Sequence, residues 1–155
     1  MWLRDRGFVI APGTFLRDQK AGDVALADVK VSEIAVIGPD RLVILERISR
    51  TTKLYQVTLS PQYHVPAEHM DVDTRPTLEQ SSAAADLPDH FPVLPKSLVL
   101  TTDDAPEMDR DLEGLVVISP NELILVTDND FSVEGARTRF WRVKLAVPLG
   151  QESAR

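Results

Sequence analysis

The sequence of 155 residues contains no cysteine, no long run of apolar residues and no excess of positive charge. Without cysteine the chain forms no disulfide, no thiolate metal site and no cysteine nucleophile, and its composition does not indicate a redox compartment. No stretch approaches the roughly 18 to 20 continuous apolar residues that a membrane helix needs. The first residues, MWLRDRGFVIAPG, also lack the apolar core of a signal peptide. These absences favour a soluble chain.

The charge balance narrows the class of partner. Lys and Arg number 17 against 24 Asp and Glu, which gives a net charge of -7. A field of this sign attracts neither a nucleic-acid backbone nor an anionic membrane surface, so both are excluded as main partners. Cations are the ligands that this charge favours. With 43% hydrophobic residues the chain has enough apolar side chains for the core of one domain.

Short runs rich in Val, Ile and Leu are separated by Pro, Gly, Asp and Asn, a pattern typical of strands joined by turns. Proline stands in two short links, GPD at 38–40 and SPN at 119–121, where its fixed φ favours a turn. Each link therefore predicts a hairpin. The predicted fold class is all-β, with antiparallel strands in seven segments: 33–37, 41–46, 53–59, 96–100, 114–118, 122–127 and 139–145.

The sequence also contains an internal repeat. When Pro39 is aligned with Pro120, 81 positions later, EIAVIGPDRLVILER falls beside GLVVISPNELILVTD, and apolar residues match at positions 34, 36, 37 and 42–45. Further on, KLYQVTL aligns with RFWRVKL at an offset of 86, with Tyr55 opposite Trp141. Each copy is strand, turn, strand, loop, strand, and in the first copy a fourth strand, KSLVL at 96–100, follows after a long polar insertion. Four-stranded antiparallel units repeated along a chain predict the blades of a β-propeller, with a β-sandwich as the alternative.

Two segments resemble a known family. RLVILERISRTTKLYQVTL (41–59) and DLEGLVVISPNELILVTDNDF (111–131) are similar to recognisable segments of the phytase-like β-propeller family, which is associated with esterase-like activity of phytase. The resemblance runs from about Phe8 to Leu145. It implies a single partial propeller domain that corresponds to the C-terminal portion of a longer protein, and a secreted or periplasmic location. The implied parts are a strand near 14–17, a complete blade at about 32–101, a partial blade at about 112–146 and a tail at 147–155.

Residues 60–95 form a long polar insertion within the first predicted blade. The segment is rich in Pro, Ser, Ala and Asp and exceeds the usual loop length, which indicates a functional or a mobile excursion. It holds all three histidines, but the spacing of five between His64 and His69 fits no usual zinc motif, so we interpret it as a solvated loop. Residues 81–86 predict a short helical turn.

Carboxylates gather at two places in the second copy of the repeat. Glu113 precedes Gly114 at the start of a predicted strand, a position that faces the central channel in a propeller, and Asp128, Asn129 and Asp130 follow the next strand. The hairpin between these strands would bring both groups to the same end of the sheet. Ca²⁺ takes six to eight oxygen ligands in flexible geometry, so these four residues are the predicted metal ligands. The alternative is a solvated acidic loop followed by a turn. The remaining acids of the loop are Asp103, Asp104, Glu107, Asp109 and Asp111.

A metal would supply the reaction that the sequence predicts. The chain has no GxSxG motif and no histidine beside a convincing serine, so a covalent acyl-enzyme mechanism lacks its residues. Bound Ca²⁺ would polarise a phosphate or carboxylic ester and activate water, which predicts metal-assisted hydrolysis of a small-molecule ester, with no catalytic residue assigned. The alternatives are a non-catalytic binding scaffold or an inactive truncated product. Glu46 and Arg47 are interpreted as a structural ion pair, with phosphate-facing groups as the alternative.

An incomplete propeller would leave strand edges without partners. Such edges, near 14–17 and 139–145, expose N–H and C=O groups that pair with other chains. Self-association of the chain is therefore expected.

Overall fold

The computed structural model describes residues 8, 10, 15, 28–48, 50–71, 73, 75 and 91–151. The chain divides into two compact units. The insertion unit consists of Met1–Ala11 and Thr58–Pro95, and the sheet unit of Pro12–Val57 and Lys96–Arg155. Apart from Phe15, which is buried, the predicted strand near 14–17 lies outside the described residues, as does the predicted turn at 81–86. In the described part of the chain, no helix has the length and apolar character needed to cross a membrane.

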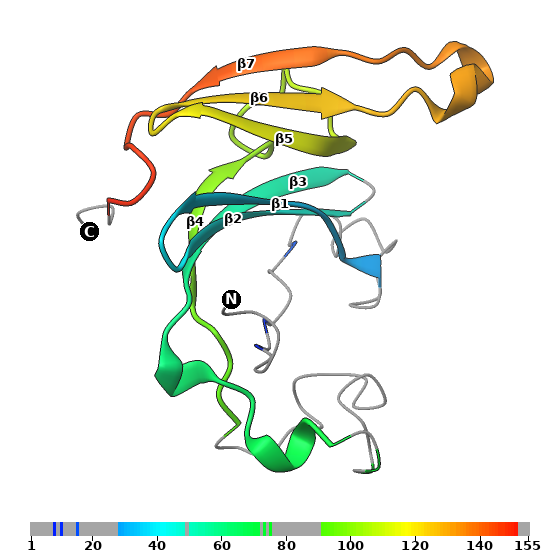
Figure 1. Ribbon diagram of the computed structural model, residues 1–155. Helices are drawn as coiled ribbons and strands as arrows, with labels where there is room; N and C mark the ends of the chain where they lie inside the picture. Colours follow the sequence, from blue (N-terminus) through cyan, green and yellow to red (C-terminus); the bar gives the residue numbers. More distant parts are fainter. Residues whose placement is uncertain are drawn as a thin grey trace. The chain divides into compact units, whose positions relative to one another are not determined.

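The sheet unit contains two β-sheets (Figure 1). The first sheet has four strands in the order β1-β2-β3-β4, and the second has three in the order β5-β6-β7. The longest helical segment among the described residues is the six-residue 3₁₀ turn Asp130–Gly135. All seven predicted strands and the all-β class are confirmed. The strands are β1 (Lys30–Gly38), β2 (Arg41–Ile48), β3 (Thr51–Thr58), β4 (Lys96–Thr101), β5 (Leu112–Ser119), β6 (Glu122–Thr127) and β7 (Phe140–Lys144).

The two hairpins β1-β2 and β5-β6 have the same register, offset by 81 residues. Both are antiparallel, and both bulge at the same repeat position, between Val31 and Glu33 in β1 and between Leu112 and Gly114 in β5. A slip of one residue would turn every side chain to the opposite face, so a shared register requires a shared pattern of buried positions. The internal repeat is thus confirmed in the backbone pairing. The matching pairs are Glu33–Leu45 with Gly114–Val126, Ile34–Ile44 with Leu115–Leu125, and Val36–Leu42 with Val117–Leu123.

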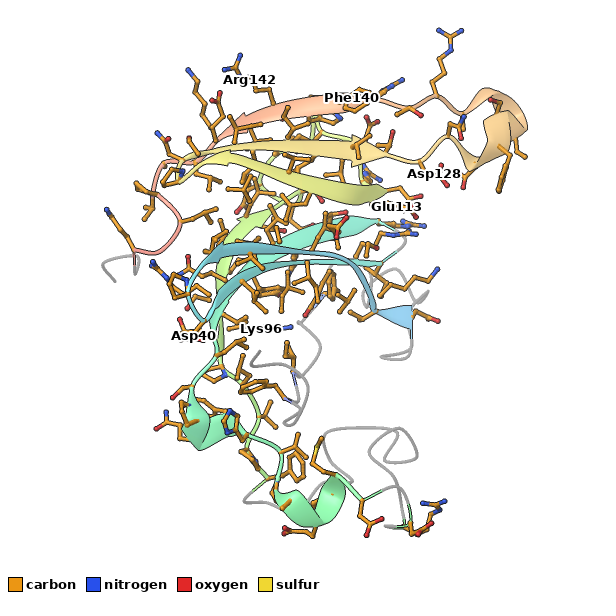
Figure 2. All side chains as sticks on the ribbon, in the orientation of Figure 1. Asp40, Lys96, Glu113, Asp128, Phe140 and Arg142 are labelled. Atoms are coloured by element: carbon orange, nitrogen blue, oxygen red, sulfur yellow. The ribbon has the colours of Figure 1, made fainter. Side chains whose placement is uncertain are left out.

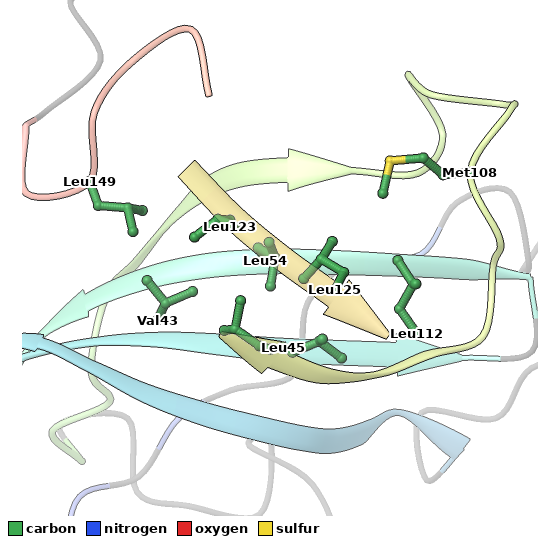
Figure 3. Packing of buried hydrophobic residues seen from close by; sticks show 9 residues of the cluster. Val43, Leu45, Leu54, Met108, Leu112, Leu123, Leu125 and Leu149 are labelled. Carbon is green, nitrogen blue, oxygen red and sulfur yellow. The ribbon is translucent and has the colours of Figure 1, made fainter. Parts of the chain in front are cut away.

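The core lies between the two sheets (Figure 3). Val43 and Leu45 of β2 pack there against Leu123 and Leu125 of β6, and all four side chains are fully buried. A short segment after β7 also reaches this core, because Leu149 is buried in it. The buried members of the cluster are Val43, Leu45, Leu54, Met108, Leu112, Leu115, Leu123, Leu125 and Leu149.

The two sheets meet through different faces of the repeat. Val43 and Leu45 face the core, but their repeat equivalents in β6 are Ile124 and Val126, which alternate with the buried Leu123 and Leu125 and so lie on the opposite face. In a sandwich of two sheets related by a twofold axis, equivalent faces would meet. We call the face of each sheet that carries Val43 and Leu45, or their repeat equivalents Ile124 and Val126, its front, and the opposite face its rear. The front of the first sheet packs against the rear of the second, which is the relation between consecutive members of a series.

The rear of the first sheet buries a charged pair. Lys96 of β4 donates to the carboxylate of Glu46 on β2, which is only 1% exposed, and the Lys96 ammonium lies 4.2 Å from the centroid of the Tyr55 ring. Burial, together with the nearby Glu46 charge, raises the pKa of the Tyr55 hydroxyl to about 12. Burial lowers the pKa of the Lys96 ammonium, although the hydrogen bond to Glu46 acts in the opposite direction.

Three apolar residues of the insertion unit, Val65, Phe91 and Leu94, are buried. The predicted solvated loop is therefore structured where it is described. The two described histidines that could have been metal ligands pack on aromatic rings instead: His64 lies 5.0 Å from the ring of Phe8, and His69 lies 5.2 Å from that of Phe91.

Among the described residues, β7 is an edge strand of the second sheet, because it is the last strand in the order β5-β6-β7. The expected self-association through this edge stays a prediction.

Candidate functional site

Glu113 and Asp128 lie at the same end of the second sheet (Figure 2). The hairpin through Ser119, Pro120 and Asn121 places Leu112 opposite Thr127, so the start of β5 is beside the end of β6. Glu113 directly follows Leu112, and Asp128 directly follows Thr127. The two acids therefore come to the same end of the sheet, as the hairpin predicts.

Arg47 holds Glu113. One terminal nitrogen of its guanidinium donates to Glu113 Oε1, the other donates to Asp111 Oδ1, and Nε donates to Ser32 Oγ at 3.0 Å. The guanidinium, 16% exposed, thus stands between two carboxylates where a metal ion would otherwise be needed to offset their repulsion. This arrangement was not visible in the sequence, because Arg47 lies 64 and 66 residues from its partners.

The interpretation of Glu46 and Arg47 as a pair is corrected by the structure. Consecutive residues of a strand point to opposite faces of a sheet, so their side chains reach different partners. Glu46 binds Lys96 at the rear of the first sheet, whereas Arg47 binds Asp111 and Glu113 of the second copy of the repeat. Both side chains do form structural ion pairs, but in two separate places.

Gly114 is explained by packing against the neighbouring strand. A Cβ atom at this position would lie 2.5 Å from Cγ1 of Val126, its partner on β6, which is closer than two carbons approach. A glycine inside a strand often marks a site where a ligand or another backbone approaches closely. At Gly114 the group that fills the space is the branched side chain of Val126.

The substitution Gly114→Ala should therefore lower the free energy of unfolding by about 1–3 kcal/mol, the usual cost of overpacking. In a Val126→Ala background the clashing methyl is absent. The double variant Gly114→Ala/Val126→Ala should therefore be nearly as stable as Val126→Ala alone. Urea denaturation of the four proteins measures both effects. If alanine at 114 costs as much in the double variant as in the wild-type background, contact with Val126 is not the reason for the glycine.

Residues 128–130 form the turn that leaves β6. The backbone N–H of Asn129 donates to Asp128 Oδ1 at 2.7 Å, the local bond by which aspartate stabilises turns. Asp130, Phe131 and Ser132 then have positive φ values of 43°, 54° and 62°. Left-handed backbone in residues other than glycine costs about 1–2 kcal/mol each and is concentrated at functional sites. This strained turn is the strongest local signal for function in the second sheet.

An open hollow of about 690 Å³ lies beside this turn. Its wall carries charges of both signs: the acids are Glu107, Asp109, Asp111, Asp128 and Asp130, and the bases are Arg110, Arg137 and Arg139. Asp128 and Asp130 are thus the two predicted metal ligands that the structure brings to one cavity, while Glu113 and Asn129 are not part of its wall. Within the described residues, no group of three or more acidic or histidine side chains has the geometry to hold a metal ion.

Ion pairs engage several of the other acids. Asp109 accepts from Arg139 at 3.1 Å and from the indole of Trp141 at 2.8 Å. Asp103, in the same acidic loop, accepts from the hydroxyls of Thr51 and Thr101. These carboxylates therefore fix the loop against the strands.

Three acids and two bases of the hollow form no ion pair within the part of the chain that the structure describes. They are the carboxylates of Glu107, Asp128 and Asp130 and the guanidinium groups of Arg110 and Arg137. These five charges are available to a ligand.

Comparisons with known protein families, curated proteins and solved structures found no match. The resemblance to the phytase-like propeller family therefore rests on the two sequence segments alone and stays a prediction.

The basic residues of the hollow were not singled out from the sequence. Arg137 belongs to a segment that reads as a polar link between two strands, Arg139 is the first residue of a predicted strand, and Arg110 stands alone among five acids of a loop. One signal was present: Arg110 stands between Asp109 and Asp111 just before the start of one predicted strand, and Asp128 follows the end of the next. It acquires meaning only once the hairpin has brought those ends together.

Proposed function

We propose that the chain is a binding module made of two consecutive propeller-type blades, and that its hollow binds a small phosphate or carboxylic ester. The blade relation is supported by the shared register and by the packing of the front of one sheet on the rear of the next. The sequence resemblance to phytase-like propellers points the same way. The four-stranded first sheet has the size and meander order of one blade.

The observation that carries the binding role is a pair of guanidinium groups on the wall of the hollow, those of Arg110 and Arg137, which form no ion pair with any described residue. Arginine presents planar donors that match the oxygens of a phosphate or carboxylate. A volume of about 690 Å³ accommodates a small organic ester. The overall charge of -7 opposes anion binding at long range, so affinity must come from these close contacts.

Titration of phenyl phosphate into the chain, followed by calorimetry or by amide chemical shifts, tests this role. The substitution Arg137→Gln should weaken binding about tenfold, because a hydrogen bond to a charged group contributes about 1.5–3 kcal/mol. Arg142→Gln is the matched control, since Arg142 is exposed on β7, pairs with Glu122 at 2.6 Å and is not part of the hollow. Equal affinities for wild type and Arg137→Gln would remove the hollow as the ligand site.

Metal-assisted hydrolysis is a second candidate, favoured by the carboxylates of Asp128 and Asp130 on the same hollow. Together with Asn129, they are the oxygen ligands that would hold Ca²⁺ beside a bound ester. Bound there, the ion would offset ester charge and make bound water more acidic. Glu113 would contribute only after release from Arg47. As these residues supply few of the six to eight ligands needed, affinity should be low, on the order of millimolar.

Calcium titration separates the two candidates. Asp128→Asn and Glu113→Gln should each weaken calcium binding if both residues are ligands. Arg47→Gln should strengthen it, because the change frees the carboxylates of Asp111 and Glu113. Phosphatase and esterase turnover is measured on the same four proteins. Identical calcium affinities throughout, with no turnover, would leave binding of the ester as the only function of the hollow.

A further inference from the structure

Two apolar surfaces of the sheet unit are exposed. The first, here called the outer face, belongs to β5 and β6 and includes Val116 and Ile118, which are 54% and 52% exposed. The second, called the rear strip, runs along β1 and consists of Val31, Ile34 and Val36, which are between 50% and 74% exposed. Exposed apolar residues in contiguous rows of this kind mark interaction surfaces more often than chance placement does.

The repeat assigns a buried equivalent to each of these surfaces. The rear strip corresponds to the inner side of β5, which packs against the first sheet. The outer face corresponds to the front of β1, which takes part in the same core. The equivalences, 81 residues apart, are Val31 with Leu112, Ile34 with Leu115, Val36 with Val117, Ala35 with Val116, and Ile37 with Ile118.

The charges at the ends of the strands follow the same rule. Inside the chain, Arg47 binds Asp111 across the two sheets. The repeat equivalent of Arg47 is Asp128, and the repeat equivalent of Asp111 is Lys30. These two equivalents also carry opposite charges, with the signs exchanged. Both Asp128 and Lys30 are exposed. An interface that repeats the internal one would therefore bring an aspartate from one copy against a lysine from the next.

We propose that a second copy of this chain docks the rear strip of its β1 on the outer face of the first copy, and so repeats the packing of β5 on β1 and β2. The contact is heterologous: each copy offers one surface and accepts the other, which leads to a ring or to an open series. Internally, the contact between the sheets is made mainly by β5, so the strip along β1 is the matching part of a second copy. Ile44 and Tyr55, on the same side of the first sheet, are already buried. The inference rests on the repeat and not on ligand binding in the hollow.

A pair of complementary variants tests the proposal by sedimentation velocity across a range of concentrations. Wild-type chains should show a mass that rises above 17.2 kDa with concentration. Val36→Glu disables the rear strip and Val116→Glu the outer face, so each variant alone should associate at least about tenfold more weakly, because a carboxylate would enter an apolar contact. An equimolar mixture of the two variants retains one intact pair of surfaces and should form a heterodimer that stops at two chains.

Val133→Glu is the matched control, because Val133 is 60% exposed in the turn after β6 and belongs to neither surface; it should associate like the wild type. Circular dichroism and thermal melts of all variants verify the fold. In a second experiment, Lys30→Asp and Asp128→Lys should each weaken association, and the two variants mixed should recover it. A wild type that stays monomeric, a single variant that associates as well as the wild type, or a mixture that stays monomeric would overturn the proposal. A single variant that associates as well as the wild type would indicate pairing through the β7 edge or a symmetric contact of equivalent faces.

Discussion

Replacing Lys96 with Met should lower the free energy of unfolding by about 3–5 kcal/mol, the usual cost of removing one partner from a buried ion pair. Glu46 is 1% exposed, and the Lys96 side chain is 11% exposed. Without the ammonium, the buried carboxylate must keep its charge in an apolar setting or take up a proton on folding. Both routes cost free energy. The loss should therefore be larger at pH 7 than in mild acid, where protonation of a carboxylate is cheaper.

The double variant Glu46→Met/Lys96→Met is the informative partner of this experiment. Well-packed apolar residues often replace a buried ion pair without loss, so the double variant should be closer in stability to the wild type than Lys96→Met is. Lys144→Met, on the exposed side of β7, is the matched control and should change stability by less than about 0.5 kcal/mol. A small effect of Lys96→Met in guanidinium denaturation at pH 7 would mean that water reaches Glu46.

Most of the fold of the sheet unit was predictable from local pattern. The seven strands follow from short apolar runs bounded by turn residues, and the repeat follows from two matching hairpins around Pro39 and Pro120. The register within each hairpin is set by the short turn and by the need to keep one face buried. The short turn and the alternation of buried residues are local properties, so both can be read from the sequence.

The contacts between distant segments were not predictable in the same way. The bond from Arg47 to Glu113 and the clash that excludes a side chain at Gly114 each depend on which strands become neighbours. The segment after β7 gives another example. It reads as a tail, yet Leu149 enters the core, and the peptide of Gly150 is held by Arg41 at 3.1 Å and by Gln56 at 2.6 Å. No periodicity marks a single buried residue.

The candidate site was half predictable. Acidic residues at a strand end are visible in the sequence, and the hairpin explains why Asp128 lies near the start of β5. The sequence did not show that positively charged groups surround these acids, because most of the arginines come from other segments. Residues that look like an acidic cluster in the sequence are therefore, in space, surrounded by groups of both charges, and Asp109, Asp111 and Glu113 form ion pairs.

Leu45→Ala and Leu125→Ala should each lower the free energy of unfolding by about 2–5 kcal/mol, because both side chains are fully buried and their loss leaves a cavity. Leu45 belongs to the first sheet and Leu125 to the second, but they share one core. The two sheets should therefore unfold together, and a change in either should shift the same transition.

Trp141 on β7, whose fluorescence reports on the second sheet alone, makes this testable. In a Trp2→Phe background, Leu45→Ala should move the Trp141 transition in urea by as much as it moves the β-sheet signal in circular dichroism. Val116→Ala, at a 54% exposed position, is the control and should move neither by more than about 0.5 kcal/mol. If Leu45→Ala left the Trp141 transition in place, the sheets would unfold independently. Packing of the front of one sheet on the rear of the next would then contribute little to stability, and the same contact between two copies would be too weak to form.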